Sequence, residues 1–355
     1  MRSTAISRVQ RIIRSNESTV GLRRLLSSAS LQSEALHRDP AVEVTVTKTR
    51  QPAAPSLQSD ETALVDSLLS YTSSLVDASA SNIIAFSGGV DSSLAAALVY
   101  RSFHNDSTRN QSGNVKAVLG VSNSLPERQL LLARDVASMI GIDLLEVSTT
   151  EGSDETYIEN NGKACFICKS HLYSALEAVS QKASEISNAN GSRQDVVLYN
   201  GTNADDTQDP TRLGLVAASN FSVRSPLIHS TKDEVRRASR HLNLPNWNFA
   251  ASPCLRSRLA LGVEATEGHL RAVNMAEERV RNVLSLNDTM DMRVRMLSGK
   301  RAMVELDQQW FADGNFDNAM AEEILRSQGF EQYCKDLGFD GGIGIRPFKS
   351  GSVSL

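Results

Sequence analysis

Ser87-Gly88-Gly89-Val90-Asp91-Ser92 follows the apolar run Ile83–Phe86 directly and leads into the apolar run Leu94–Val99. This order predicts a strand, a tight turn and the start of a helix. Two adjacent glycines let the backbone turn sharply and come close to an anion, and the amides and hydroxyls that follow point at the same place. Asp91 is well placed to hold a magnesium ion that bridges phosphate oxygens. The stretch therefore predicts a pocket for a nucleotide with its metal ion.

This turn differs from the Walker-type phosphate loop, because the lysine that must follow its glycine is missing and the spacing is shorter. It resembles the PP-loop, the SGGxDS signature of enzymes that cleave ATP between its α and β phosphates and adenylate a substrate. The resemblance implies that ATP and Mg2+ are bound by Ser87, Gly88, Gly89, Asp91 and Ser92. A glycine turn that merely joins a strand to a helix is the alternative. The order of strand, loop and helix favours the nucleotide site.

Apolar runs and helical patterns alternate on both sides of this turn. A helical face precedes it, and the predicted strands and helices after it are Val115–Val121, a helix begun by a capping box at Ser124–Glu127 and closed by Gly141, Ile142–Val147, a helix over about 169–187, and Val196–Tyr199. Such alternation predicts an α/β fold with a doubly wound parallel sheet, whose ligands bind at the carboxyl ends of the strands.

The carboxyl end of the Val196–Tyr199 strand carries the polar run Asn200–Asp206, a dense set of small donors and carboxylates. One interpretation makes it a second wall of the nucleotide pocket. The other makes it a surface turn whose Asx residues cap a helix. Its place at a strand end beside the glycine turn favours the pocket wall.

Composition limits the classes of function. The 355 residues suffice for two domains, and 41% apolar with 22% charged residues indicates a globular chain. A net charge of -4 advertises no large basic surface, so a nucleic-acid partner is not expected. No uncharged apolar run approaches the roughly 20 residues that span a bilayer, so no membrane insertion is expected either. Four cysteines make no disulfide framework in a chain of this size, which favours a reducing compartment.

The first 40 residues differ from the rest, with seven arginines, no lysine and eight serines. This composition is typical of an organellar transit peptide. We expect import into the mitochondrial matrix, with a plastid as the alternative because of the serine content. An ordinary disordered tail, which would leave the protein cytoplasmic, is the other interpretation. Residues 40–58 continue as a proline-containing linker, so residues 1–58 are excluded from the predicted fold.

A cysteine near two arginines stands in the segment Ser252-Pro253-Cys254-Leu255-Arg256-Ser257-Arg258. Nearby guanidinium groups favour the thiolate, which is the nucleophilic form of cysteine. A buried cysteine with its arginines turned away is the alternative.

Several motifs follow one another in a fixed order from about Asp60 to the C-terminus: SGGVDS, Cys165-Phe166-Ile167-Cys168-Lys169, Gly201–Asp206, Ser225-Pro226-Leu227, Lys232–Arg236, Leu244-Pro245-Asn246-Trp247 and Pro253–Arg258. This order resembles the LarE family of ATP-dependent sacrificial sulfur transferases. The resemblance implies a PP-loop domain over 59–262, a small α+β C-terminal domain over 263–355 for substrate binding, and a homo-oligomer.

The family's substrate is a nicotinate-derived pyridinium mononucleotide with two carboxylates, and its product is a precursor of the nickel-pincer nucleotide. The resemblance implies that ATP adenylates a carboxylate and that the thiolate of Cys254, activated by Arg256 or Arg258, displaces AMP to give a thioester. Cleavage of the cysteine's own carbon–sulfur bond then leaves a thiocarboxylate and dehydroalanine. One turnover would consume the protein.

The resemblance also assigns further residues. It places Gly201, Asn203, Asp206 and Arg258 at the nucleotide, and its acidic metal positions fall on Glu278, Glu305 and Asp313. Arg293 and Arg295 stand two apart on a predicted strand, so both side chains leave the same face and form a clamp for the substrate phosphate. Ordinary surface salt bridges are the alternative for these last five residues.

This sequence departs from the family pattern in places. Asp209–Gly214 replaces an aspartate-aromatic-Arg-Pro-Gly run, Arg256 stands where a small residue is usual, and Ala260-Leu261-Gly262 replaces Pro-Tyr-Gly. The identity of the substrate is therefore less firmly implied than the reaction.

Cys165 and Cys168, with two residues between them, have two interpretations that imply different sources of the transferred sulfur. A helix-start packing element is one interpretation. The other pools Cys165, Cys168 and Cys254 as ligands of an iron–sulfur cluster with one open iron, in an enzyme that transfers external sulfide. A PP-loop tRNA thiolase, an NAD or GMP synthetase-like amidotransferase and a non-catalytic nucleotide sensor stay open as further alternatives.

Overall fold

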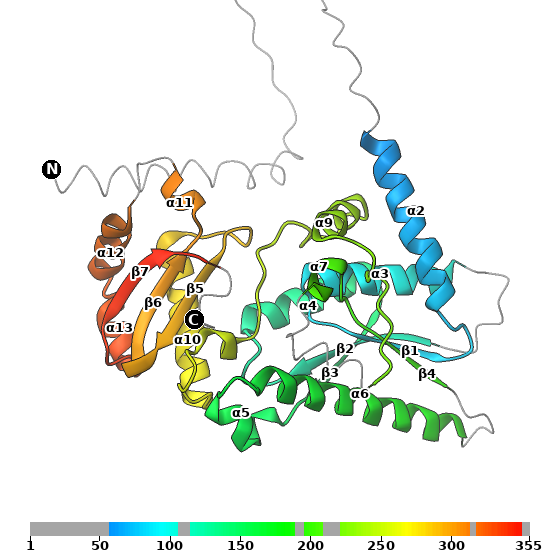
Figure 1. The fold of residues 1–355 in the computed structure, drawn as a ribbon, viewed down its shortest axis with the longest axis horizontal. Helices are drawn as coiled ribbons and strands as arrows, with labels where there is room; N and C mark the ends of the chain where they lie inside the picture. The colour runs from blue at the N-terminus through cyan, green and yellow to red at the C-terminus, as the bar shows by residue number, and fades with distance from the viewer. Residues whose placement is uncertain (1–56, 106–113, 189–194, 209–220, 313–316, 350–355) are drawn as a thin grey trace, which may run out of the picture. The chain divides into compact units, whose positions relative to one another are not determined.

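The computed structural model describes residues 57–105, 114–188, 195–208, 221–312 and 317–349 (Figure 1). The transit-peptide and linker predictions therefore lie outside the described residues, except that helix α2 (Leu57–Leu75) already begins within the predicted linker. The segment 209–214 and Asp313 also lie outside them.

Four parallel strands form the central sheet: β1 (Ser81–Ala85), β2 (Asn114–Val121), β3 (Asp143–Ser148) and β4 (Val196–Tyr199). Their order is β3-β2-β1-β4, with Ile84 in register with both Ala117 and Tyr199. The strands match the predicted apolar runs to within two residues at each end. The α/β alternation predicted from the sequence is confirmed, and β1 lies in the interior of the sheet.

Helices cover both faces of this sheet, as a doubly wound fold requires (Figure 1). On one face α3 (Val90–His104) and α4 (Glu127–Ile140) pack against Ile84 and its neighbours. On the other, α6 (Ala164–Asn188) packs through Tyr173 and Leu176 against Ile83. Adjacent isoleucines thus face opposite layers because side chains alternate along a strand.

Of the two predicted ends of α4, the structure confirms one, and a capping box begins a further helix. Gly141 ends α4 in the left-handed conformation (φ 82°), and Thr231 with Glu234 forms a capping box at the start of α9 (Lys232–His241). The capping box predicted at Ser124 is wrong, because α4 begins after Pro126 and has no side-chain cap. The Ser124 hydroxyl instead lies 2.9 Å from that of Ser122.

A second sheet of three strands follows, in the order β5 (Met292–Leu297), β6 (Arg301–Leu306) and β7 (Ile343–Pro347). Strands β5 and β6 are antiparallel, and β6 and β7 are parallel. Its apolar core includes residues of α10 (Glu267–Leu284) and also Tyr157, Ala164, Leu255 and Leu259 from earlier in the chain. The predicted domain boundary at 262/263 stays a prediction.

The remaining helices are short: α5 (Glu155–Glu159), α7 (Ala204–Thr207), α11 (Gln309–Ala312), α12 (Asn318–Ser327) and α13 (Phe330–Asp336). The helical sequence pattern near 319–337 predicts a single helix, and this prediction is wrong because Gly329 adopts φ 70° and separates α12 from α13. No helix in the described ranges is long and apolar enough to cross a bilayer.

Candidate functional site

Ser87–Ser92, called the glycine loop below, connects the carboxyl end of β1 to α3. The Ser87 amide donates to Ser92 Oγ at 3.2 Å, and that hydroxyl lies 3.1 Å from the Gly89 carbonyl oxygen. Gly88 has φ 69°, and a Cβ there would lie 2.7 Å from Ala133 Cα of α4. Only glycine fits, so the tight turn is built into the packing of α4 on the sheet.

No side chain caps α3 at Gly89, its N-cap residue. The first amides of this 15-residue helix belong to the glycine loop and have no side-chain partner at the N-cap. Such uncapped amides suit the binding of an anion.

The carboxyl end of β4 lies against the glycine loop. A Cβ on Gly201 would lie 2.7 Å from the Asp91 carbonyl carbon, so the two backbones are in close contact. Asn203 Nδ2 donates to Asp91 Oδ1 at 2.9 Å, and Asn203 also forms a capping box with Asp206 at the start of α7. The run Asn200–Asp206 can therefore cap a helix and also line the pocket, since Asn203 both caps α7 and contacts Asp91.

Lys232 is a partner of Asp91 that the sequence did not indicate. Its ammonium forms an ion pair with Asp91 Oδ2, and both side chains are partly exposed. Lys232 was recognised only as part of a motif, because nothing in its neighbourhood along the chain shows that α9 begins beside β1. A magnesium ion at Asp91 would have to compete with this ammonium.

Asn246 and Gln129 were also missed. Asn246 is fully buried, and its amide nitrogen donates to the Gly88 carbonyl at 2.7 Å and to Ser93 Oγ at 3.0 Å. Gln129 Nε2 donates to the Ser87 carbonyl at 2.6 Å. Both amides satisfy carbonyls that a strand or helix would otherwise pair, so they hold the shape of the glycine loop. The only sequence signal was the place of Asn246 in the Leu244–Trp247 motif.

The segment Ala251–Arg258, called the cysteine loop below, reaches the same edge of the sheet. The Leu255 amide donates to the Ser124 carbonyl at 2.7 Å, just beyond the carboxyl end of β2. Because β2 pairs with β1, this bond sets the partly exposed Cys254 at the strand end adjacent to the glycine loop.

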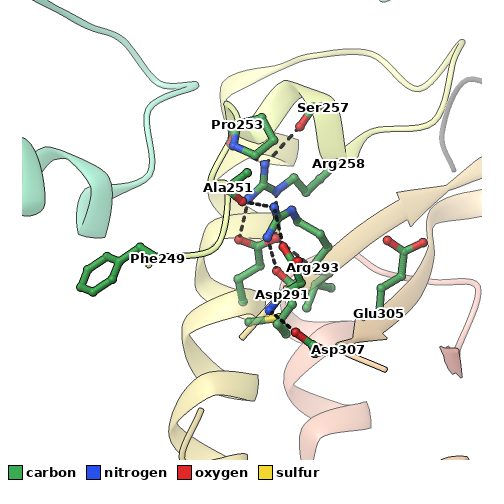
Figure 2. A network of polar contacts seen from close by, with 12 residues as sticks. Phe249, Ala251, Pro253, Ser257, Arg258, Asp291, Arg293, Glu305 and Asp307 are labelled. Atoms are coloured by element: carbon green, nitrogen blue, oxygen red, sulfur yellow. Dashed lines mark hydrogen bonds and ion pairs between the residues drawn. The ribbon is translucent and has the colours of Figure 1, made fainter. Parts of the chain in front are cut away.

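Three buried arginines donate to carbonyl groups of the cysteine loop, and Figure 2 labels two of them, Arg258 and Arg293. Arg258 Nη1 contacts the carbonyls of Pro253 and Cys254, the latter at 3.2 Å. Arg293 donates to the Ala251 carbonyl, and Arg295 Nη1 to the Ser257 carbonyl at 2.9 Å. Their exposed fractions are only 1%, 4% and 5%. Burial, and then the charge of Arg258, lowers the pKa of Arg293 to about 10.

These contacts bear on the predicted roles. Arg293 and Arg295 were assigned to the substrate phosphate and Arg258 to the nucleotide, and in the structure each of the three directs at least one donor to a carbonyl of the cysteine loop. Those ligand roles stay predictions. A burial of 95% or more means that a ligand could meet these guanidinium groups only after the loop had moved.

The predicted acidic residues do not come together. Glu305 is fully buried and accepts from Arg295 Nε at 2.6 Å and from Arg346 Nη2 at 2.6 Å. Glu278 is partly exposed and lies 4.0 Å from Arg128. In the described ranges no three His, Cys, Asp or Glu side chains are placed so that they could hold a metal ion. The metal roles of Asp91, Glu278, Glu305 and Asp313 stay predictions.

Three cysteines are electrostatic neighbours beside the cysteine loop. Burial, followed by the charges of Cys254 and Glu151, raises the pKa of Cys168 to about 12. Arg256 Nη2 donates to the exposed Cys165 Sγ at 2.6 Å. Burial alone would lower the pKa of Arg256, but the negative charges of Cys165 and Cys254 outweigh it and raise that pKa. Arg256 therefore interacts with both sulfurs, whereas Arg258 is directed to backbone carbonyls.

Comparison with known proteins gives two informative relatives. The chain is 36% identical over 251 residues to the uncharacterised protein slr1717 of Synechocystis, covering 70% of this chain and 84% of the relative. It is 28% identical over 257 residues to pyridinium-3,5-bisthiocarboxylic acid mononucleotide synthase of Lactiplantibacillus plantarum, covering 72% and 85%. The chain belongs to a LarE-like family. No protein-family model matches it.

Membership of this LarE-like family confirms the resemblance drawn from the order of motifs. Both matches extend over more than two thirds of the chain, so they span more than one of the motifs that carried it. The second relative is named for a product that carries two thiocarboxylates.

Proposed function

We propose that this protein is an ATP-dependent sulfur transferase of the PP-loop superfamily. Its substrate would be a pyridinium-3,5-biscarboxylic acid mononucleotide, one carboxylate of which it adenylates and then thiolates in the biosynthesis of a nickel-pincer cofactor. The observation that carries the proposal is the bond from the Leu255 amide to the Ser124 carbonyl. It brings a cysteine to the strand end beside a phosphate-binding type of loop. The named relative supports the choice of substrate.

The donor set at the end of β1 fits a nucleotide phosphate. The hydroxyls of Ser87 and Ser92 lie 3.0 Å apart, and the uncapped start of α3 adds backbone amides. Asp91 would hold Mg2+, which neutralises phosphate charge, and Lys232 would be released toward the phosphates. Asn203 would keep the Asp91 carboxylate oriented during this exchange.

The proposed chemistry proceeds in balanced steps. A carboxylate is a poor acyl donor, so reaction with ATP gives an acyl-adenylate and releases pyrophosphate. The Cys254 thiolate attacks the acyl carbon, and AMP leaves with the electron pair of the broken carbon–oxygen bond. Loss of the Cys254 α-proton then expels the thiocarboxylate from Cβ. The product takes the sulfur, and dehydroalanine remains at position 254.

Intact-protein mass spectrometry tests this proposal. After reaction with ATP, Mg2+ and the pyridinium substrate, the protein should lose the mass of one hydrogen sulfide, and peptide mapping should place the loss at Cys254. Cys254→Ser should still release pyrophosphate but show no such loss. An unchanged mass at Cys254 in protein that does release pyrophosphate would contradict the sacrificial step.

The charge interactions of Cys168 with Cys254 and of Arg256 with Cys165 and Cys254 favour one second candidate, an iron–sulfur-dependent thiolase. Its cluster would use Cys165, Cys168 and Cys254 and would let the enzyme turn over repeatedly with added sulfide. As the sulfurs lie in the described structure they do not form a metal-holding group, so no step is drawn through a cluster. Iron and sulfide analysis of anaerobically purified protein separates the two. About four of each per chain would support the cluster.

A further inference from the structure

Glu277 is a buried carboxylate that no step of the proposed reaction uses. It lies on α10, next in sequence to Glu278, and is 6% exposed. Its Oε1 accepts from Arg258 Nε at 2.9 Å, and its Oε2 lies 3.4 Å from Arg258 Nη2. Burial by itself would raise the pKa of Glu277, but the charge and hydrogen bonding of Arg258, with the charge of Arg293 and the Val294 amide, together outweigh burial and lower that pKa. The result is a two-contact ion pair between ionised groups inside the protein.

The same carboxylate also fixes β5. The Val294 amide donates to Glu277 Oε1 at 3.1 Å, between the two arginines of that strand. Arg258, oriented by Glu277, turns Nη1 to the carbonyls of Pro253 and Cys254 and lies 3.1 Å from Ser257 Oγ (Figure 2). Glu277 and Arg258 together thus connect strand β5 with the carbonyls of Pro253 and Cys254.

We propose that Glu277 is a positioning residue for the sulfur-transfer step: through Arg258 it fixes the backbone on both sides of Cys254 and so sets the direction of the cysteine side chain. The inference rests on the proposed function, because it assigns Glu277 to the attack of Cys254 on the acyl-adenylate. It predicts that nucleotide chemistry at the glycine loop does not depend on Glu277, since the hydrogen bonds of Glu277 and Arg258 go to the cysteine loop and to β5.

A purely structural ion pair and a positioning pair respond differently to replacement. A buried ion pair can often be exchanged for apolar side chains of similar volume without loss of stability. The carbonyl contacts of Arg258 would be lost in that exchange even if the fold were kept. Small displacements of a reacting group by about 1 Å can slow a reaction by about a hundredfold. Stability and sulfur transfer should therefore separate.

The experiment compares Glu277→Gln with Glu267→Gln, which removes a carboxylate from an exposed position on the same helix. Single-turnover reactions follow pyrophosphate release and dehydroalanine formation in the same samples. We expect Glu277→Gln to release pyrophosphate at the wild-type rate and to form dehydroalanine at least about tenfold more slowly. Glu267→Gln should match wild type in both steps.

A second variant covers the case in which Glu277→Gln fails to fold. Arg258→Met combined with Glu277→Leu replaces the pair by apolar side chains, and a thermal melt shows whether it is folded. Folded double variant that keeps pyrophosphate release but loses at least about tenfold in dehydroalanine formation supports the inference. Wild-type sulfur transfer in either folded variant overturns it, and so does an equal loss in both steps, which would place Arg258 at the nucleotide.

Hydrogen exchange gives a readout that needs no substrate. Amides of the peptide 251–258, among them the Leu255 amide bound to Ser124, should exchange about tenfold faster in Glu277→Gln than in Glu267→Gln. Unchanged exchange overturns the inference. If wild type released no pyrophosphate or kept its Cys254 sulfur, the proposed function would fail, and the exchange comparison would still show whether Glu277 fixes the loop.

Discussion

The glycine loop and the cysteine loop lie at the same edge of one sheet but are built in opposite ways. The glycine loop takes its shape from backbone conformation at Gly88 and from serine hydroxyls within six residues of one another. The cysteine loop has one short helical turn of its own, Leu255–Arg258, and is held by arginines up to 42 residues away along the chain, the separation between Arg293 and Ala251. The shape of the glycine loop thus depends on a short local motif, whereas the position of Cys254 depends on helix α10 and strand β5.

The largest expected effect separates the two loops by reaction step. Asp91→Ala should abolish pyrophosphate release, because it removes the proposed magnesium ligand. The fold should survive, since Asp91 is partly exposed and its ion pair is with a partly exposed lysine. A pyrophosphate assay with a thermal melt on the same sample checks both. Thr62→Ala changes a residue of α2 outside both loops and serves as the control for the preparation of variant protein. Undiminished pyrophosphate release would remove Asp91 from the nucleotide site.

A buried arginine of the cysteine loop should matter for stability as well as for chemistry. Arg295→Met removes one of the two arginine partners of fully buried Glu305 and should cost about 3 kcal/mol in unfolding free energy. Urea denaturation measures the cost. If Arg295 serves only to bind the substrate phosphate, stability will be unchanged and substrate titration will shift instead, by about 1.5 to 3 kcal/mol with ATP affinity intact.

The glycine loop has a matched control for its steric constraint. Gly88→Ala and Gly329→Ala both introduce a side chain at φ near 70°, but only Gly88 faces Ala133, whereas nothing lies within 4 Å of a Cβ at Gly329. Gly88→Ala should therefore lose about 2 kcal/mol more in unfolding free energy. Equal losses in urea denaturation would mean that backbone strain alone selects glycine at this position.

The smallest expected effect is a pH dependence beside the cysteine loop. Burial raises the pKa of Cys168 to about 12 from its ordinary value near 9. Above pH 9 the unfolded chain releases this proton and the folded chain keeps it, so stability falls as pH rises toward 12. Cys168→Ala should reduce that fall by about 1 kcal/mol between pH 9 and pH 10. If urea denaturation showed the same fall in stability between pH 9 and pH 10 for wild type and Cys168→Ala, the Cys168 thiol would be open to solvent.

The sequence by itself determined the sheet and the glycine loop. Ile83 and Ile84 are adjacent apolar residues that must be covered on both faces, and the run from Ser87 to Ser92 contains the donors and the turn within one short segment. The spacing of apolar residues and the backbone freedom of glycine depend only on neighbouring residues, so both can be recognised in a sequence. The order of motifs was enough to predict the LarE-like family that the relatives show.

Only the tertiary structure decided the surroundings of Asp91 and Cys254. Lys232 contacts Asp91, which is 141 residues away along the chain, and Asn246 contacts Gly88, which is 158 residues away. No sequence pattern indicates either contact. The strand carrying Arg293 and Arg295 was predicted correctly, but a two-residue period shows which face a side chain leaves and not what lies opposite. What lies opposite Arg293 and Arg295 depends on the packing of α10 and the cysteine loop against β5. Buried charged side chains hold these segments together, although they are far apart along the chain.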